Sequence, residues 1–458
     1  MGSAVARGAS YASISRIFQA GLAFLLVVVL ATILGPSQFG VYTITISIAA
    51  MLQYVCGHWL SSAILREADD GEQAVTQGEV DHLLLLIALA TALLYAAVYF
   101  FWGERAALYT VLCWLVVAVE LAFLCQTSFA AAKEEWGRFS LAYAGRGLLA
   151  LLLVAGVAVY TSSAAWTLAA YGVNTGLAAL ICRRRLGGGS SFARLFGMFR
   201  RYAGLGLTAI IRQLYDRGDR VVVGALFGAE MAGTYGLASD LVRRPMQTLG
   251  GAMHAAFFPR LARLYDRDEE AFKVRWKANS LVVAWSAAIS AVAGIVAADL
   301  LFVSLGTYSA VLLTFAVVLS ISAAVETFDT FHSSYALIGA RRLDRLPIVY
   351  AAAGLVFVLF AAFARFSGNA LLIAWGVVAA NIFGICGVVI LSSRKAHKVA
   401  VTREVAYPLL YCVLSVATWF FLRDGGHLAQ QIVVATALGA VGLAAAGINI
   451  YRRRASFE

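Results

Sequence analysis

Seven arginines lie inside long apolar segments of the chain, where an isolated charge is costly. Of the 36 Lys and Arg residues, these are Arg16, Arg146, Arg212, Arg217, Arg220, Arg243 and Arg244. An arginine at the centre of a membrane helix costs roughly 2.5–3.5 kcal/mol on insertion scales, so each needs a partner or a water-filled cavity. A guanidinium keeps its charge and can engage phosphate oxygens bidentately. The group therefore predicts a membrane protein with an internal site for an anionic ligand.

Depth in the membrane ranks these arginines. At 1.5 Å per residue, Arg217 lies about 16 Å from the predicted turn that follows it, near mid-membrane. Arg243 and Arg244 come out at a similar depth, so these three are the main candidates for binding the anion. Three further arginines are expected to support them: Arg212, Arg220 and Arg16. Arg16 and Arg146 lie close enough to the cytoplasmic side to snorkel.

Acidic residues among the arginines leave a second interpretation open, namely structural ion pairing. Arg212–Asp216 and Asp240–Arg244 have the i, i+4 spacing that favours pairing on a helix. Residues 212–244 contain five of the arginines but only three aspartates, Asp216, Asp219 and Asp240. Three other acids could absorb the surplus if they face the same cavity: Glu120, Glu326 and Asp329. Glu326 and Asp329 are also the candidates for binding a coupling ion, H⁺ or Na⁺.

The polar residues of span seven predict a wide polar face. On a continuous helix at 100° per residue, Asp219, Arg212, Asp216, Arg220, Gln213 and Arg217 cover an arc of about 160°. Leu214 and Val221 lie largely opposite. This pattern predicts one helix that turns its charges toward a cavity.

Composition places these arginines in an all-α, polytopic membrane protein. The chain is 61% apolar and 13% charged, with a mean hydropathy of +0.81. A span needs about 20 apolar residues. Fourteen transmembrane helices are predicted, at 9–34, 38–65, 78–102, 106–131, 139–160, 163–182, 203–227, 231–258, 278–298, 307–338, 347–364, 370–391, 405–422 and 429–450.

Loop charges predict that both termini are cytoplasmic. Outside the seven arginines, one set of loops and ends carries 26 basic residues and the opposite set carries only three: Arg105, Arg365 and Arg423. Short cytoplasmic loops carry an excess of Lys and Arg, which assigns the richer set to the inside. The net charge of +11 is then an orientation signal beside anionic membrane lipids, and a nucleic-acid partner is not expected.

An internal repeat predicts two lobes. The segments LGPSQFGVY and FGAEMAGTYG place Gly35, Gly40 and Tyr42 against Gly228, Gly233 and Tyr235, each pair 193 residues apart. Glycine suits a tight turn, and tyrosine suits the membrane interface. Because the offset covers six spans, the copies share one orientation and a pseudo-two-fold axis normal to the membrane. The prediction is a six-helix lobe at 1–182, a basic cytoplasmic linker at 183–202, a second six-helix lobe at 203–391, and two extra helices with a cytoplasmic tail at 392–458.

The chain resembles a known family through LGPSQFGVY, DRVVVGALFGAEMAGTYGLASD and MHAAFFPRLARL. These segments are similar to those of Wzx-type flippases, polysaccharide transporters of the multidrug/oligosaccharidyl-lipid/polysaccharide superfamily. The resemblance implies a monomeric transporter in the bacterial inner membrane that moves undecaprenyl-diphosphate-linked oligosaccharide to the periplasmic leaflet, for O-antigen, exopolysaccharide or capsule. It also implies a polysaccharide polymerase and chain-length proteins as partners.

The resemblance extends to individual residues. In the related lipid II flippases, cations on spans one, two, seven and eight line the cavity between the lobes. The matching positions are Arg16, Arg212, Arg217, Arg220, Arg243 and Arg244. Span two departs from that pattern, because it carries His58 and no buried arginine.

Other functional classes fit the residues less well. The sequence has no phosphate-cradling GxxxxGK[ST] segment, and the longest predicted periplasmic loop is too short for an extramembrane catalytic site, so neither an enzyme nor a cofactor or metal is expected. A multidrug-and-toxin-extrusion antiporter would need surplus acid for cationic substrates. A non-transporting scaffold of a polysaccharide synthase remains the other alternative.

Overall fold

The computed structural model describes residues 2–67, 77–183, 196–197, 200, 211–247, 268–305, 311–328 and 346–391, and part of 408–419. Within these ranges every regular element is a helix, and no strand occurs. Six helical segments of the described residues are long and apolar enough to cross a membrane. The all-helical prediction is therefore confirmed for this part of the chain.

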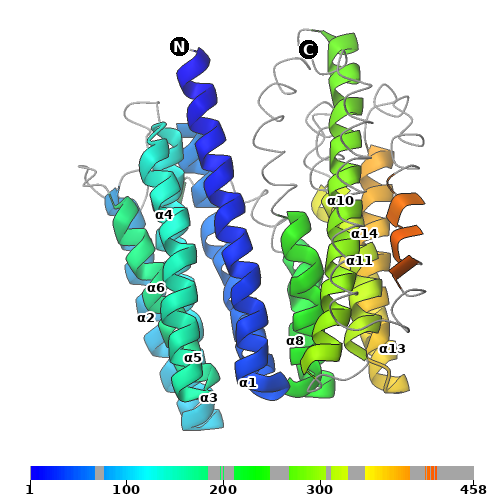
Figure 1. The fold of residues 1–458 in the computed structure, drawn as a ribbon. Helices are drawn as coiled ribbons and strands as arrows, with labels where there is room; N and C mark the ends of the chain where they lie inside the picture. Colours follow the sequence, from blue (N-terminus) through cyan, green and yellow to red (C-terminus); the bar gives the residue numbers. More distant parts are fainter. Residues whose placement is uncertain are drawn as a thin grey trace. The chain divides into compact units, whose positions relative to one another are not determined.

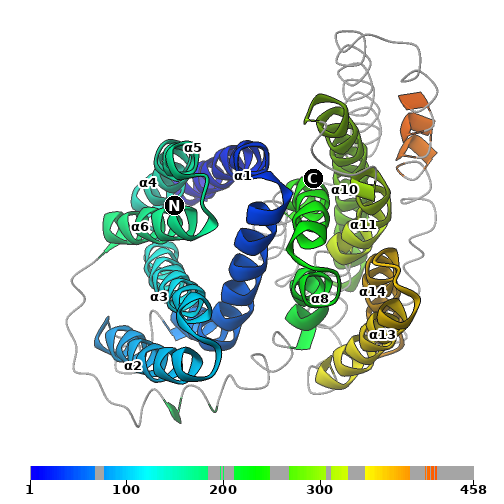
Figure 2. The same cartoon turned by 90° about the horizontal axis from the view of Figure 1, so that it is seen from below.

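The chain divides into two compact units, Met1–Gly236 and Leu237–Glu458. The first contains α1 (Gly2–Glu67), α2 (Gln77–Trp102), α3 (Glu104–Ala132), α4 (Trp136–Leu149), the π-helical turn η2 (Ala150–Val154), α5 (Ala155–Thr161), α6 (Ala164–Cys182), the helical residues 211–216, α8 (Gly218–Phe227) and the start of a helix at 229–247. Figure 2 shows α3 beside α2 and α6, and α3 also packs against α1. This central helix carries the buried apolar side chains Val117 and Leu121.

The second unit contains α10 (Glu269–Leu305), α11 (Val311–Phe328), α13 (Leu346–Ser367) and α14 (Leu371–Leu391) (Figure 1). Helices α13 and α14 pack against each other, and α11 packs against both α10 and α14. The Trp419 indole donates a hydrogen bond of 2.9 Å to the buried carboxylate of Asp299 on α10. Part of the predicted thirteenth span is thus attached to the core of this unit.

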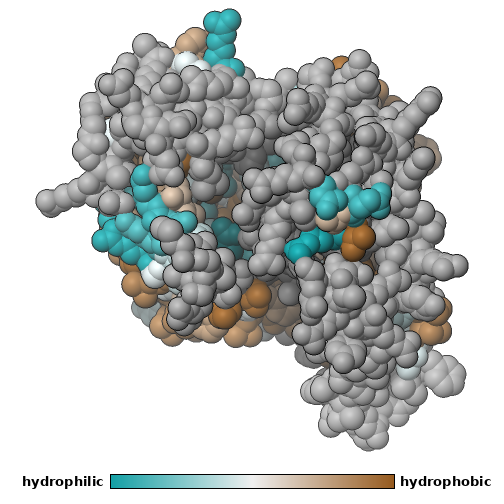
Figure 3. Space-filling model, turned by 90° about the horizontal axis from the view of Figure 1, so that it is seen from above, coloured by the Kyte–Doolittle hydropathy of each residue, from teal (hydrophilic) through white to brown (hydrophobic). Residues whose placement is uncertain are grey.

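Large apolar side chains on the outside of the helices indicate that these helices are surrounded by lipid. Leu85, Leu89 and Leu93 are more than half exposed and follow one face of α2 at a spacing of four residues. On α13, Leu355 and Phe363 are exposed in the same way. Figure 3 shows such brown, apolar side chains at the rim of the described atoms. Exposed apolar surface on this scale would be unfavourable in water and is expected for helices that face lipid.

Most described helices lie over the predicted spans, although α10 extends beyond span nine, 278–298, at both ends. Spans one and two form α1, which is interrupted at Gly35, where φ is 67° and ψ is 171°, and continues from Pro36. Glycine adopts this positive φ without the steric cost that a side chain would add. The predicted fourteenth span, 429–450, lies outside the described residues, as does most of the linker 183–202. The count of fourteen and the division into two six-helix lobes therefore stay predictions.

The two repeated turns have the same backbone conformation and contact each other. Gly228 has φ 88° and ψ 171°, matching its equivalent Gly35. An added Cβ on Gly40 would overlap the carbonyl of Ala229, and one on Gly233 would overlap the carbonyl of Pro36. Ala229 and Gly233 are the equivalents of Pro36 and Gly40 at the 193-residue offset, so the contact is reciprocal. Reciprocal contact is what a local two-fold axis between two copies produces.

The repeated tyrosines are buried among the helices and do not reach the membrane interface, so that part of the prediction is wrong. Tyr235 is fully buried and Tyr42 is 6% exposed. Tyr42 stacks near Phe39, whereas the Tyr235 hydroxyl donates a hydrogen bond to Asp219. A buried tyrosine needs a partner for its hydroxyl, and for Tyr235 that requirement is met inside the helix bundle.

Candidate functional site: the intramembrane arginines

Span seven is broken at Arg217. The helix at 211–216 stops there, Arg217 has φ −126° and ψ −29°, and α8 begins at Gly218. The prediction of one continuous polar arc over 212–220 is therefore wrong, because the break changes the helical phase. Broken membrane helices are tolerated where the backbone is buried in protein or lines a cavity. Arg217, which the sequence predicts to lie near mid-membrane, is thus the N-cap residue of α8.

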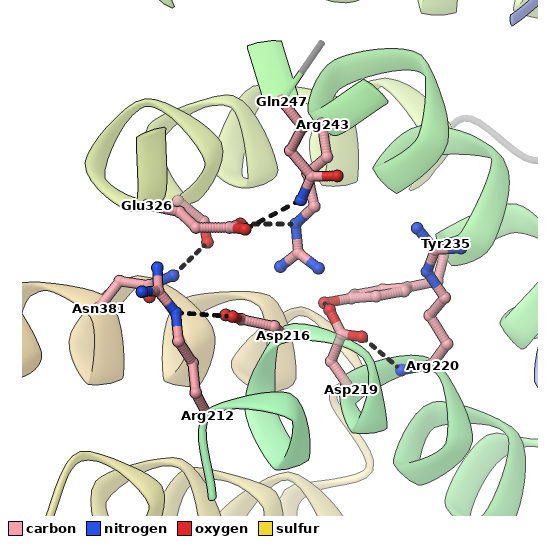
Figure 4. Close-up of polar contacts among 10 residues, drawn as sticks. Arg212, Asp216, Asp219, Arg220, Tyr235, Arg243, Gln247, Glu326 and Asn381 are labelled. Carbon is pink, nitrogen blue, oxygen red and sulfur yellow. Dashed lines mark hydrogen bonds and ion pairs between the residues drawn. The ribbon is translucent and has the colours of Figure 1, made fainter. Parts of the chain in front are cut away.

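Asp219 is held by hydrogen bonds and takes a structural position. Its carboxylate accepts from the Tyr235 hydroxyl at 2.9 Å and from the backbone N–H of Arg220 at 2.8 Å (Figure 4). Both Asp219 and Arg220 are buried. The pair of contacts joins the first turn of α8 to the helix at 229–247.

The predicted pairing of Arg212 with Asp216 occurs. Arg212 Nε lies 3.0 Å from Asp216 Oδ2, one helical turn away (Figure 4). Asp216 is 6% exposed, whereas the side chain of Arg212 is 18% exposed. The pairing satisfies much of the charge of both residues.

The second unit contains its own cluster of charges. Arg244 Nη2 lies 2.9 Å from Asp240 Oδ2, as the i, i+4 spacing predicts. Arg243 Nε lies 3.9 Å from Glu326 Oε2, and the Gln247 amide donates to Glu326 Oε1 at 2.9 Å (Figure 4). Arg243 is almost fully buried, whereas the Arg244 side chain is 31% exposed. Glu326 therefore faces the arginines of span eight, and Asp329 lies outside the described residues.

Arg146 forms a buried cluster with residues of neighbouring helices. Its Nη2 donates to the Glu120 carboxylate and, at 2.7 Å, to the Tyr171 hydroxyl, which itself donates to the same Glu120 oxygen at 2.6 Å. The guanidinium also lies 4.6 Å from the centre of the Phe123 ring. The cluster joins α3, α4 and α6. Glu120 is thus engaged by Arg146, as a structural ion pair requires.

Removing Glu120 alone is expected to destabilise the protein. Glu120→Leu leaves the Arg146 charge buried without its carboxylate, a change that costs about 3–5 kcal/mol in comparable buried pairs. We expect a lower thermal midpoint in detergent and a lower abundance in the membrane. The double variant Glu120→Leu/Arg146→Met serves as the control and should recover most of the loss. Equal stability of the single and double variants would contradict the assignment of a buried pair.

Arg16 makes only aromatic contacts among the described residues. Its guanidinium carbon lies 4.9 Å from the Phe139 ring centre and 5.4 Å from that of Tyr143, both on α4. Its Nε has no hydrogen-bond partner there. Cation–π contacts position a guanidinium over the rings and leave its N–H donors for another acceptor.

Arg16 and Arg217 therefore have no carboxylate partner in the described part of the chain. The side chain of Arg217 forms neither a hydrogen bond nor an ion pair with any described residue. Both belong to the first unit. The membrane depth predicted from the sequence marked Arg217 as a main candidate. No feature of the sequence showed that its guanidinium lacks a carboxylate partner while that of Arg212 has one.

The sequence matches the family model for polysaccharide biosynthesis proteins over residues 29–308, more than half of the chain. The chain belongs to this family. No curated protein matches it by sequence. The predicted family resemblance is thereby confirmed.

Solved structures of transporters share its fold. The lipid II flippase MurJ, in an inward closed conformation, superimposes with a TM-score of 0.68 at 12% identity, covering 94% of this chain and 97% of MurJ. A multidrug resistance MATE family transporter of the MOP superfamily gives 0.54 at 16% identity, covering 87% and 96%. A MOP superfamily transporter from Pyrococcus furiosus, described as having a binding pocket of reverse polarity, gives 0.54 at 17% identity, covering 84% and 95%.

The family protein described here is therefore a multi-pass membrane protein with the fold of MurJ and the MATE transporters. The proteins that share this fold are transporters and flippases rather than enzymes. Identities of 12–17% establish the fold and leave the substrate to be argued from the residues.

Proposed function

We propose that the protein is a flippase that moves an undecaprenyl-diphosphate-linked oligosaccharide from the cytoplasmic to the periplasmic leaflet of a bacterial inner membrane. The observation that carries the proposal is the guanidinium of Arg217, which has no carboxylate partner in the described residues and sits at a break in a membrane helix. Keeping such a charge in an apolar segment costs roughly 2.5–3.5 kcal/mol. A ligand with phosphate oxygens would offset that cost each time it binds.

The other arginines have graded roles in this proposal. Arg16 would be the second hydrogen-bond donor to the diphosphate, since its guanidinium is held against two aromatic rings. Arg243 and Arg244 would contribute from the second unit, where Arg244 keeps a partly exposed side chain beside Asp240. Arg212 and Arg220 would hold the local charge balance together with Asp216 and Asp219. Glu326 remains the candidate for binding a coupling ion, which would compete with Arg243 for its carboxylate.

The transport cycle would follow from two lobes of six helices each. The reciprocal contact between Gly40 and Gly233 supports a two-fold relation between the copies. Rocking of one repeat against the other is how transporters built from repeats expose a central site to either side. The sugar headgroup would cross between the lobes while the polyprenyl tail stays in lipid. The membrane potential contributes about 2.3 kcal/mol per charge per 100 mV to outward movement of the anionic diphosphate.

Ligand binding separates this function from its rivals. Purified protein should bind undecaprenyl-diphosphate-linked oligosaccharide, and Arg217→Ala should weaken that binding by at least tenfold. A hydrophobic organic cation should not compete, whereas inorganic diphosphate should. Competition by the cation would favour a drug antiporter of the MATE type. Absence of any diphosphate-lipid binding by folded protein would favour a scaffold without transport.

A further inference from the structure

One ion pair of the second unit is loose although it is buried. Arg243 Nε lies 3.9 Å from Glu326 Oε2. In the neighbouring pair, the Arg244 and Asp240 side chains meet at 2.9 Å. Glu326 Oε2 accepts no hydrogen bond from a described residue, whereas the Gln247 amide donates to the other oxygen at 2.9 Å. One oxygen of this buried carboxylate is therefore held by charge alone.

The Arg243 guanidinium meets Glu326 through a single nitrogen. The contact is made by Nε, and Figure 4 shows the end of the guanidinium extending past the carboxylate. A guanidinium binds carboxylate or phosphate most strongly when two of its N–H groups engage two oxygens. The contact with Glu326 does not use that geometry. A phosphate group that used it would compete favourably for Arg243.

Close contacts inside the second unit hold the helices that carry these two side chains. The Asn381 amide on α14 donates to Ser322 Oγ at 3.1 Å, one turn before Glu326 on α11, and both partners are buried. On α10, a Cβ added to Gly294 would lie 3.0 Å from the Cα of Val242, the residue before the arginine. An exchange of partners at this ion pair can therefore occur through movement of the two long side chains alone.

We propose that Glu326 is a positioning residue that substitutes for the substrate: it engages Arg243 between turnovers and releases it to the diphosphate of the lipid-linked oligosaccharide. Both side chains are almost fully buried, so each charge needs a partner at every stage of transport. After the diphosphate leaves, the carboxylate compensates the guanidinium again. While the diphosphate is bound, a coupling cation would neutralise the carboxylate. The proposal rests on the transport function proposed above, and it adds how the site is emptied.

Glu326→Gln tests the exchange, because it removes the competing charge and keeps an oxygen that can accept from Gln247. If Glu326 holds Arg243 about nine-tenths of the time, the apparent affinity for the substrate is lowered about tenfold. We therefore expect purified Glu326→Gln protein to bind undecaprenyl diphosphate about tenfold more tightly than the parent protein. Release should slow accordingly, so the initial rate of transfer of the lipid-linked oligosaccharide across vesicle membranes should fall.

The gain in affinity should depend on Arg243. In the Arg243→Ala background, Glu326→Gln should leave the dissociation constant unchanged, because there is no guanidinium to release. Ser322→Ala is the matched control on the same helix, since it removes the hydrogen bond to Asn381 and keeps every charge. It should lower the thermal midpoint without tightening binding. If Glu326→Gln does not fold, Glu326→Asp takes its place and should also tighten binding, because it draws the carboxylate back by one methylene.

The outcomes separate the exchange from the substrate assignment. If the parent protein binds and transfers the diphosphate lipid but the Glu326 variants bind it no more tightly, Glu326 has only a structural role and the exchange is wrong. A gain in affinity that persists without Arg243 would overturn the exchange as well. If the folded parent protein binds no diphosphate lipid, the proposed function is wrong and the exchange falls with it.

Discussion

Arg217→Ala is expected to abolish transport of the lipid-linked oligosaccharide while leaving the protein folded and abundant. The physical reason is the absence of a carboxylate partner for Arg217 among the described residues. Removing Arg217 takes a partner from no described carboxylate. The substitution also removes the cost of roughly 2.5–3.5 kcal/mol of holding an arginine in the apolar segment. A thermal midpoint equal to or above that of the parent protein is therefore expected together with loss of transport.

Two further variants sharpen the test of Arg217. Arg217→Lys should restore only part of the activity, because lysine keeps the charge but lacks the planar fork that engages two phosphate oxygens. Arg212→Ala is the matched control on the same span. It leaves Asp216 without the partner seen at 3.0 Å, so its main defect should be reduced stability. Undiminished transport by Arg217→Ala would remove the residue from the binding site.

Arg244→Ala is expected to abolish transport and to reduce protein abundance as well. Arg244 pairs with the buried Asp240 at 2.9 Å, and its loss takes this cation away from the carboxylate. Removing one member of a buried pair costs about 3–5 kcal/mol, although the partial exposure of Arg244 lowers that cost. Abundance in membranes and transport in a strain lacking the native gene are the two measurements.

The double variant Asp240→Ala/Arg244→Ala separates binding from pairing. It removes both charges, so abundance should return to that of the parent protein. If Arg244 binds the diphosphate, transport stays absent in the double variant. Full recovery of transport would mean that Arg244 only neutralises Asp240.

Local signals in the sequence predicted the helices and the short-range contacts. Apolar runs of about 20 residues located the spans, and the glycine repeat located the turns at Gly35 and Gly228. The pairs Arg212–Asp216 and Asp240–Arg244 followed from their spacing of four residues. In each case, the distance along the chain alone fixes the distance in space.

Contacts between distant segments could not be predicted in this way. Arg146 meets Glu120 and Tyr171 because three helices pack together, and Asp219 meets Tyr235 across a turn. From the sequence, Glu120 was only one of three acids that could pair with the surplus arginines. The break at Arg217 was equally hidden, although the adjacent Gly218, a residue of low helix propensity, was a weak signal for it.

Transport is most directly measured as transfer of a fluorescent undecaprenyl-diphosphate-linked oligosaccharide across the membrane of vesicles that contain the purified protein. We expect transfer well above that of protein-free vesicles, and its loss when the protein carries Arg217→Ala. Transfer no faster than in protein-free vesicles, or transfer undiminished by Arg217→Ala, would contradict the proposed function.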